Sequence, residues 1–141
     1  MTLSERNAFH EAGHAAACVA YGIPLVSATI ADAYHPYVLP GNYRWRGRLA
    51  FENLVIMTLA GGEAETYFCG PHAGDTVDKQ MAHEYLADHL DAAQIATVIK
   101  RLRFAARGFV RHPWAQRRIP RIADALLEYG TMTGAEIRAL R

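Results

Sequence analysis

Long apolar runs are missing from this chain of 141 residues. No stretch reaches the roughly 18 apolar residues that a membrane-spanning helix needs. The most apolar window, residues 54–60, is short and is followed by a glycine pair, so it predicts a buried helix. Residues 1–6 lead straight into a helical pattern and lack the apolar centre of a signal peptide. We therefore expect no membrane among the partners of this chain.

Cysteine is scarce as well, since Cys18 and Cys69 are the only two. Two cysteines do not make a disulfide framework, and free thiols are typical of a cytoplasmic protein. The sequence also has no low-complexity run, internal repeat or flexible linker. A chain of this length suits one hydrophobic core, so we expect a single cytoplasmic domain over residues 1–141.

Acidic residues are missing from one long segment. Residues 100–121 contain eight Lys or Arg residues and no Asp or Glu, although the formal net charge of the whole chain is only +1. A basic helix that also carries Phe104, Phe109 and Trp114 suggests nucleic acid. These aromatic residues fit an apolar stripe, however, so we expect a buried stripe, a solvated basic face and no nucleic-acid partner.

The first predicted element is a helix from about Ser4 to Tyr21. Ser4 is a good N-cap, and Gly22 followed by Pro24 is a stop signal. Three consecutive alanines inside the segment allow close packing against a neighbour. The pattern therefore predicts a smooth, closely packed helix at the start of the chain.

Two strand candidates follow, residues 25–30 and, more weakly, residues 48–51. Between them lie about 17 residues, 31–47, that are rich in aromatic side chains such as Tyr34 and Trp45. Loops of this length are often functional. We expect the segment between these two aromatics to border the functional site and to contact a substrate or partner. The alternative is a mobile excursion with a small packing cluster of its own.

The remaining segments predict helices over residues 52–68, from residue 78 towards 91, across residues 95–109, and through a segment that ends at Gly130. Thr133 and Glu136 then form a capping box for a terminal turn. Together these elements predict a compact, mainly α fold with a small β-hairpin-like element.

One motif in the first helix carries chemistry. His10 and His14 are four residues apart, so both imidazoles lie on one helix face and can reach one cation. Zinc suits two imidazoles together with a further protein ligand from elsewhere. Glu11 follows the first histidine directly, where its carboxylate can reach a water on the metal and act as general base.

A third ligand is not fixed by this motif, because no further histidine follows at a ligating spacing. The acidic candidates are Glu52, Glu63, Glu65, Asp75 and Asp78. Asp78 stands at the start of a predicted helix just after a glycine-containing loop, where a carboxylate can be aimed well. For Asp75 and Asp78 the alternative role is that of a helix N-cap.

Three blocks of the sequence resemble the peptidase domain of the FtsH-type zinc metalloproteases. Residues 8–15 (AFHEAGHA) look like the zinc helix of that family, and residues 59–65 (LAGGEAE) are similar to its Leu-Ala-Gly-x-x-Ala-Glu segment. Residues 74–82 (GDTVDKQMA) look like its Gly-x-x-x-Asp junction between a loop and a helix. The end of the chain, residues 125–137, resembles the terminal helices of the family.

The resemblance implies a compact helical zinc-peptidase domain with Zn²⁺ as cofactor. His10, His14 and Asp78 would be the metal ligands, and Glu11 the catalytic base. Glu65 would orient a ligating imidazole from outside the ligand set; the alternative is an ordinary surface glutamate. The expected substrate is a peptide or an unfolded protein.

Two departures from the family shape the functional expectation. The chain has no Walker-type glycine-rich loop and no membrane anchor, so we expect hydrolysis that is independent of ATP. A homo-oligomer or an activating partner stays compatible with the sequence. The alternative function is a non-catalytic, zinc-stabilised domain that binds a protein partner or nucleic acid through its basic helix. The intact Glu11 favours the enzyme, because a binding module needs only the metal ligands.

Overall fold

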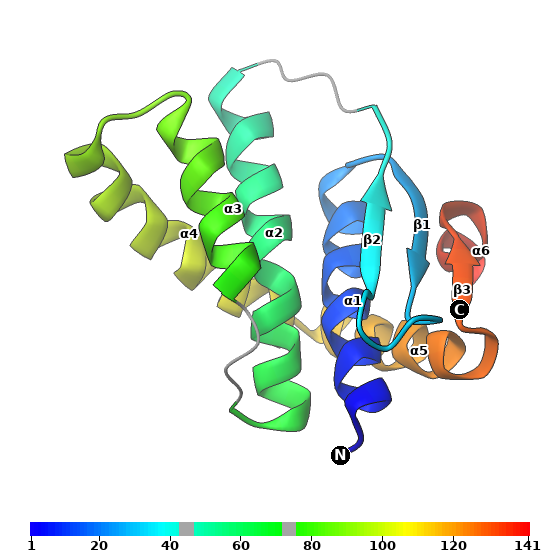
Figure 1. The fold of residues 1–141 in the computed structure, drawn as a ribbon. Helices are drawn as coiled ribbons and strands as arrows, with labels where there is room; N and C mark the ends of the chain where they lie inside the picture. The colour runs from blue at the N-terminus through cyan, green and yellow to red at the C-terminus, as the bar shows by residue number, and fades with distance from the viewer. Residues whose placement is uncertain (43–46, 72–75) are drawn as a thin grey trace.

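The computed structural model describes residues 1–42, 47–71 and 76–141. Helices dominate the described residues, and a small antiparallel sheet covers one side of the first helix (Figure 1). The elements follow in the order α1 (Leu3–Tyr21), β1 (Leu25–Thr29), β2 (Tyr37–Pro40), α2 (Gly47–Cys69), α3 (Thr76–Ala87), α4 (Ala92–Arg111), α5 (Pro113–Tyr129), β3 (Thr131–Thr133) and α6 (Gly134–Ala139). The mainly α fold with a small β element is confirmed.

The sheet has the strand order β2-β1-β3 with antiparallel pairing throughout. β3 reaches β1 from the far end of the chain, which makes the predicted hairpin-like element a three-stranded sheet. The weak strand predicted at residues 48–51 is wrong, because these residues begin α2. Phe51 and Leu54 continue a buried helical stripe there, and Arg48 pairs with Glu52 one turn later at 3.1 Å.

The long segment after β1 contains the second strand, β2, so it is not the continuous loop that the sequence suggested. Its first part bends at Asp32, whose carboxylate accepts the Tyr34 N–H at 2.9 Å. β2 is an edge strand among the described residues, and three of its four residues are exposed. Pro40 is tolerated there because an edge strand has backbone groups without ladder partners.

Capping boxes mark the starts of three helices, α1, α4 and α6. Thr2, not the expected Ser4, is the N-cap of α1, since a capping box with Glu5 satisfies two backbone N–H groups at once. The predicted box of Thr133 and Glu136 is confirmed at the start of α6. α3 ends well before Asp91, because Asp91 caps α4 in a box with Gln94.

α1 is the central element of the fold. α2 packs along one side of it, and α5 and the sheet cover the others. Nine of its residues between Ala8 and Cys18 are therefore buried. Gly13 permits the α1–α2 contact, because a Cβ at this position would lie 2.6 Å from the Ala60 carbonyl oxygen and from the Ala64 Cβ. The two helices therefore meet at backbone distance directly beside the histidine motif.

α4 lies on the far side of α2 from the sheet (Figure 1). Its buried residues, Val98, Leu102, Ala106 and Val110, line one face, as expected for an amphipathic helix. No helix among the described residues is both long enough and apolar enough to cross a membrane.

Candidate metal centre

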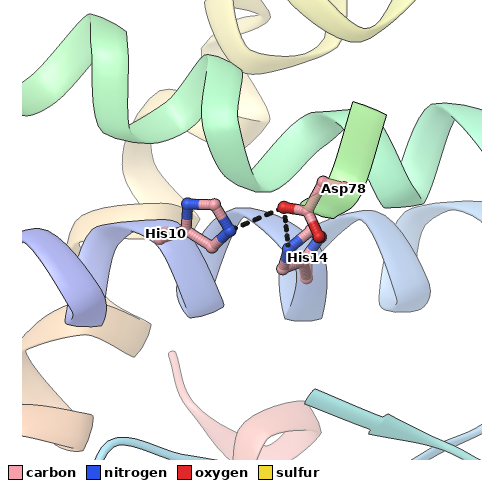
Figure 2. Close-up of side chains that lie close together, drawn as sticks. All are labelled: His10, His14 and Asp78. Carbon is pink, nitrogen blue, oxygen red and sulfur yellow. Dashed lines mark hydrogen bonds and ion pairs between the residues drawn. The ribbon is translucent and has the colours of Figure 1, made fainter. Parts of the chain in front are cut away.

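Three side chains from two helices converge at the middle of α1. His10 and His14 project from adjacent turns of that helix, and Asp78 reaches them from the first turn of α3 (Figure 2). One carboxylate oxygen, Asp78 Oδ2, lies 2.7 Å from His10 Nε2 and 3.2 Å from His14 Nε2. The ligand atoms of the three residues all lie within 4.8 Å of one another, which is a spacing that one metal ion can bridge.

The outer nitrogen of each imidazole has a partner of its own. His10 Nδ1 lies 2.9 Å from Glu65 Oε2, and His14 Nδ1 lies 2.8 Å from the Met57 carbonyl oxygen. A carbonyl or a carboxylate can only accept here, so each Nδ1 donates its proton outwards. In the neutral imidazole the Nε2 lone pair then faces the cluster, which is the form that binds a metal.

The His14 ring needs a glycine in the facing helix. A Cβ at Gly61 would lie 2.5 Å from Cε1 and 2.7 Å from Cδ2 of this ring, closer than non-bonded carbons approach. Sequence reasoning assigned no role to Gly61 or to the Met57 carbonyl. Gly61 could have been noticed, because it lies in the segment that resembles the FtsH-type family. The Met57 carbonyl could not, because a contact of the backbone leaves no pattern of side chains in the sequence.

Glu65 is a buried residue and not the surface glutamate of the alternative interpretation, with only 8% of its area exposed. Its second oxygen, Oε1, pairs with Arg6 Nε at 3.3 Å. The Arg6 guanidinium also donates to the carbonyls of Cys69 and Gly70 at the end of α2. Arg6 therefore fixes Glu65, and Glu65 fixes the His10 ring, in one connected network.

The electrostatics of the cluster favour a bound positive charge. Burial by itself disfavours a charged imidazole at His10, but the hydrogen bonds to Asp78 and Glu65 outweigh it and raise the pKa of His10 to about 10. The pKa of His14 is also raised: burial opposes the charge, and the hydrogen bond to Asp78 outweighs burial. Burial similarly favours a neutral Asp78, yet both imidazoles hold the pKa of its carboxyl below the usual range. Two imidazole nitrogens, each oriented by a partner at Nδ1, and one carboxylate oxygen form a ligand group that could hold a metal ion such as zinc.

Glu11 lies beside the cluster without belonging to the ligand set. Burial raises the pKa of its carboxyl above the usual range, the imidazoles oppose this, and the negative charges of Asp78 and Glu65 add to it. The Glu11 carboxylate makes no hydrogen bond to the described residues. Among the described residues, Arg118 Nε is the only enclosed side-chain polar atom that lacks a partner. The Glu11 carboxylate also lacks a partner, so it is not enclosed and reaches the solvent of the cleft. This carboxylate is therefore positioned to exchange protons with a molecule in the cleft.

A cleft of about 800 Å³ opens over the cluster. Helices α1, α2 and α3 form one wall, and β2 with the preceding loop forms the other. Its mostly apolar lining includes Tyr34, Tyr37, Val77, Met81 and Tyr85. The segment from Tyr34 to Trp45 was expected to border the site, and its part from Tyr34 to Pro40 does so. Tyr43 and Trp45 lie outside the described residues.

The other acidic candidates do not join the cluster. Glu52 pairs with Arg48 and Arg101, and Glu63 pairs with Arg107 at 3.3 Å, so both carboxylates bind arginines of α4 instead of the cluster. Asp75 lies outside the described residues. Cys18 is buried, which raises the pKa of its thiol to about 12, and it is not part of the ligand group.

Comparison of the chain with known protein families finds no match, and comparison with curated proteins finds none either. Residues of the three sequence blocks meet at the cluster. Each of these blocks contributes to the centre: the first carries the imidazoles, the second carries Gly61 and Glu65, and the third carries Asp78.

Proposed function

We propose that this chain is a zinc-dependent peptidase that hydrolyses peptide bonds in peptides or loosely folded proteins without ATP. One observation carries the proposal: two oriented imidazoles, the Asp78 carboxylate and the Glu11 carboxylate, which has no hydrogen-bond partner, meet in a single open cleft. The resemblance of the same segments to the FtsH-type peptidase domain supports the same function.

His10, His14 and Asp78 would hold the zinc ion, and both imidazole rings are already oriented by their Nδ1 partners. When bound, zinc lowers the pKa of a coordinated water to about 7 and polarises a carbonyl group. Because Glu65 and the Met57 carbonyl keep both Nδ1 protons turned outwards, the protein fixes the ligand tautomers before any metal arrives.

Glu11 would move the proton. Its carboxylate accepts a proton from the attacking water while the water oxygen bonds to the carbonyl carbon of the substrate. The C–N bond then breaks, and Glu11 returns the same proton to the departing amine nitrogen. A raised pKa suits both steps, because a base that must later act as an acid works best when its pKa lies near the working pH.

The strand wall of the cleft offers backbone groups to a peptide. The Gly41 N–H donates to the Pro24 carbonyl at 2.8 Å and so points towards β1. Backbone groups of successive strand residues alternate in direction, so Leu39 and Tyr37 also face β1, whereas Val38 directs its N–H and C=O to the open edge. This edge faces α2 and α3, across the cleft (Figure 1).

An extended peptide can pair with this edge as an additional strand. Pro40, the next residue that faces outwards, has no N–H, so Val38 supplies the only outward N–H donor within β2. The apolar side chains around the cleft then suit side chains of the peptide on either side of the bond that is cut.

The test compares wild type with Glu11→Gln on a broad peptide library, with zinc content measured on both proteins. Glutamine keeps the shape of the side chain and removes the proton acceptor, so zinc content and Tm should stay almost unchanged. Hydrolysis should fall by about 10²–10⁴, the usual contribution of a positioned acid–base group. Equal turnover in both proteins would exclude Glu11 as the base. Zinc binding without turnover in either protein would contradict the peptidase proposal.

A further inference from the structure

The outer face of α4 carries a row of cations around one exposed aromatic ring. Lys100, Arg103, Arg107 and Arg111 follow one another at intervals of one helical turn, and Phe104 lies among them. We call these five residues the cationic stripe. All five are exposed, and Phe104 exposes 76% of its area, which is unusual for a phenylalanine.

The sequence-based expectation that the aromatic residues of this segment are buried is wrong for Phe104. It holds better for Phe109 and Trp114, which are half-buried and pack against the core, with Phe109 also in contact with Tyr21 at a ring-centroid distance of 5.6 Å. Phe104 instead lies on the side of α4 opposite its buried residues. No described helix or strand covers it.

The charges of the stripe are poorly compensated within the chain. Arg107 pairs with Glu63 at 3.3 Å, but Lys100, Arg103 and Arg111 have no acidic partner among the described residues. Like charges one turn apart on a helix repel each other and destabilise it. An anionic partner would remove this repulsion, so the stripe is better suited to a complex than to the free chain.

The geometry points to a docking surface for an acidic segment of another protein, whose carboxylates pair with the stripe while an apolar side chain packs on Phe104. An aromatic anchor within a rim of arginines is typical of protein interfaces. Gly108, one turn after Phe104, leaves open space at its Cβ position, where the partner's apolar side chain can pack.

Nucleic acid and anionic lipid fit the stripe less well. The stripe extends over only about 17 Å of helix, and Glu63, which pairs with Arg107, weakens its field. A net charge of +1 gives the chain no broad positive surface of the kind that holds a phosphate backbone. A lipid surface would need more than a single exposed apolar side chain on this face.

This surface is separate from the proposed active site. The residues that line the cleft come from α1, α2, α3 and the β1–β2 segment, and none comes from α4. Docking can therefore succeed or fail regardless of whether the chain is a peptidase.

The test uses fluorescence anisotropy with a labelled helical peptide that carries a Leu surrounded by Glu residues on one and the same face. The chain of 141 residues should bind it, and Arg103→Glu and Phe104→Ser should each weaken binding at least about tenfold, the loss expected for a central interface residue. Arg117→Glu, an exposed charge reversal on α5, is the matched control and should have little effect. Circular dichroism checks that all variants keep their helix content.

Two further probes separate the classes of partner. Oligothymidine and phosphatidylserine vesicles, measured on the same proteins, should bind more weakly than the acidic peptide. Tighter binding of the oligonucleotide or of the vesicles would overturn the proposal in favour of nucleic acid or lipid. Absence of peptide binding, or equal binding by wild type and both stripe variants, would also overturn it.

Discussion

The two walls of the cleft are built in opposite ways. The helical wall is enclosed: Glu11, His14 and Glu65 are buried, and glycines bring α1 and α2 to backbone distance beside them. The strand wall is open: Tyr34 exposes 84% of its area and Tyr37 exposes 52%. Among the described residues, one hydrogen bond, from the Asn7 amide to the Ala33 carbonyl at 2.9 Å, ties the loop of this wall to α1.

The difference separates two tasks. Chemistry needs ligand atoms that are held within narrow limits, and the helical wall supplies these through packing and through donors fixed at Nδ1. Substrate binding needs accessible backbone and apolar side chains that accept many sequences, and the strand wall supplies those. Changes in the helical wall should therefore have large effects on metal and catalysis, and changes in the strand wall should have small effects on substrate affinity.

The largest effect is expected for Gly61→Ala. The new Cβ would displace the His14 ring, so the free energy of unfolding should fall by about 1–3 kcal/mol, the usual cost of overpacking. A displaced ligand should also lower peptide hydrolysis by about 10² or more. Denaturant unfolding, zinc competition and turnover measure the three consequences.

Gly108→Ala is the matched control, because it is also a helical glycine but has open space at its Cβ position. It should stabilise the chain by about 0.5–1 kcal/mol through helix propensity and leave zinc affinity unchanged. If Gly61→Ala were equally stabilising, with zinc affinity unaltered, the close contact between His14 and α2 would be refuted.

A smaller effect is expected for Glu65→Ala. Removal of this carboxylate leaves the His10 Nδ1 proton and the Arg6 guanidinium without their partner, so the ring loses its fixed orientation. Zinc affinity should fall about 10–100-fold, which is typical for partners outside the ligand set. Glu63→Ala, on the same helix but paired with Arg107, is the control and should bind zinc like wild type. Equal zinc affinity in both variants would show that Glu65 does not orient His10.

The smallest effect is expected for Val38→Pro in the strand wall. Proline is tolerated on an edge strand when the missing N–H faces away from the sheet, so the fold should persist. Loss of this donor should raise KM about three- to tenfold, the value of one hydrogen bond, with little change in kcat. Val38→Ala separates the side chain from the backbone and should affect KM less. A large fall in kcat for Val38→Pro would contradict the division of tasks between the walls.

The helical wall was largely predictable from the sequence, and the strand wall was not. The spacing of His10 and His14 is a local feature, and helical geometry places both rings on one face of α1. The position of Asp78 after a glycine-containing loop is also local, and it places the carboxylate at the start of a helix. β2 was missed because its four residues include a proline and its apolar side chains are mostly exposed, so no alternating pattern marks it.

Contacts with other residues, near or far along the chain, explain the other gaps. The Met57 carbonyl accepts a hydrogen bond from His14 because α1 and α2 come close together at Gly13. The sequence of residues 54–60 contains no feature that predicts this backbone acceptor. Thr2 replaced Ser4 as the N-cap because a capping box needs the partner Glu5 at the right spacing. Helix boundaries and backbone acceptors thus depend on contacts that single positions do not encode.

The most direct test of the central claim is the zinc content of the purified chain and of Asp78→Asn, measured by elemental analysis after dialysis against zinc-buffered solution. Two imidazoles and one carboxylate predict about one zinc per wild-type chain. Asp78→Asn should lose most of it, because the amide has no negative charge to offer the metal, while helix content stays the same. No zinc in the wild type, or full zinc content in Asp78→Asn, would contradict the assignment of His10, His14 and Asp78 as the metal centre.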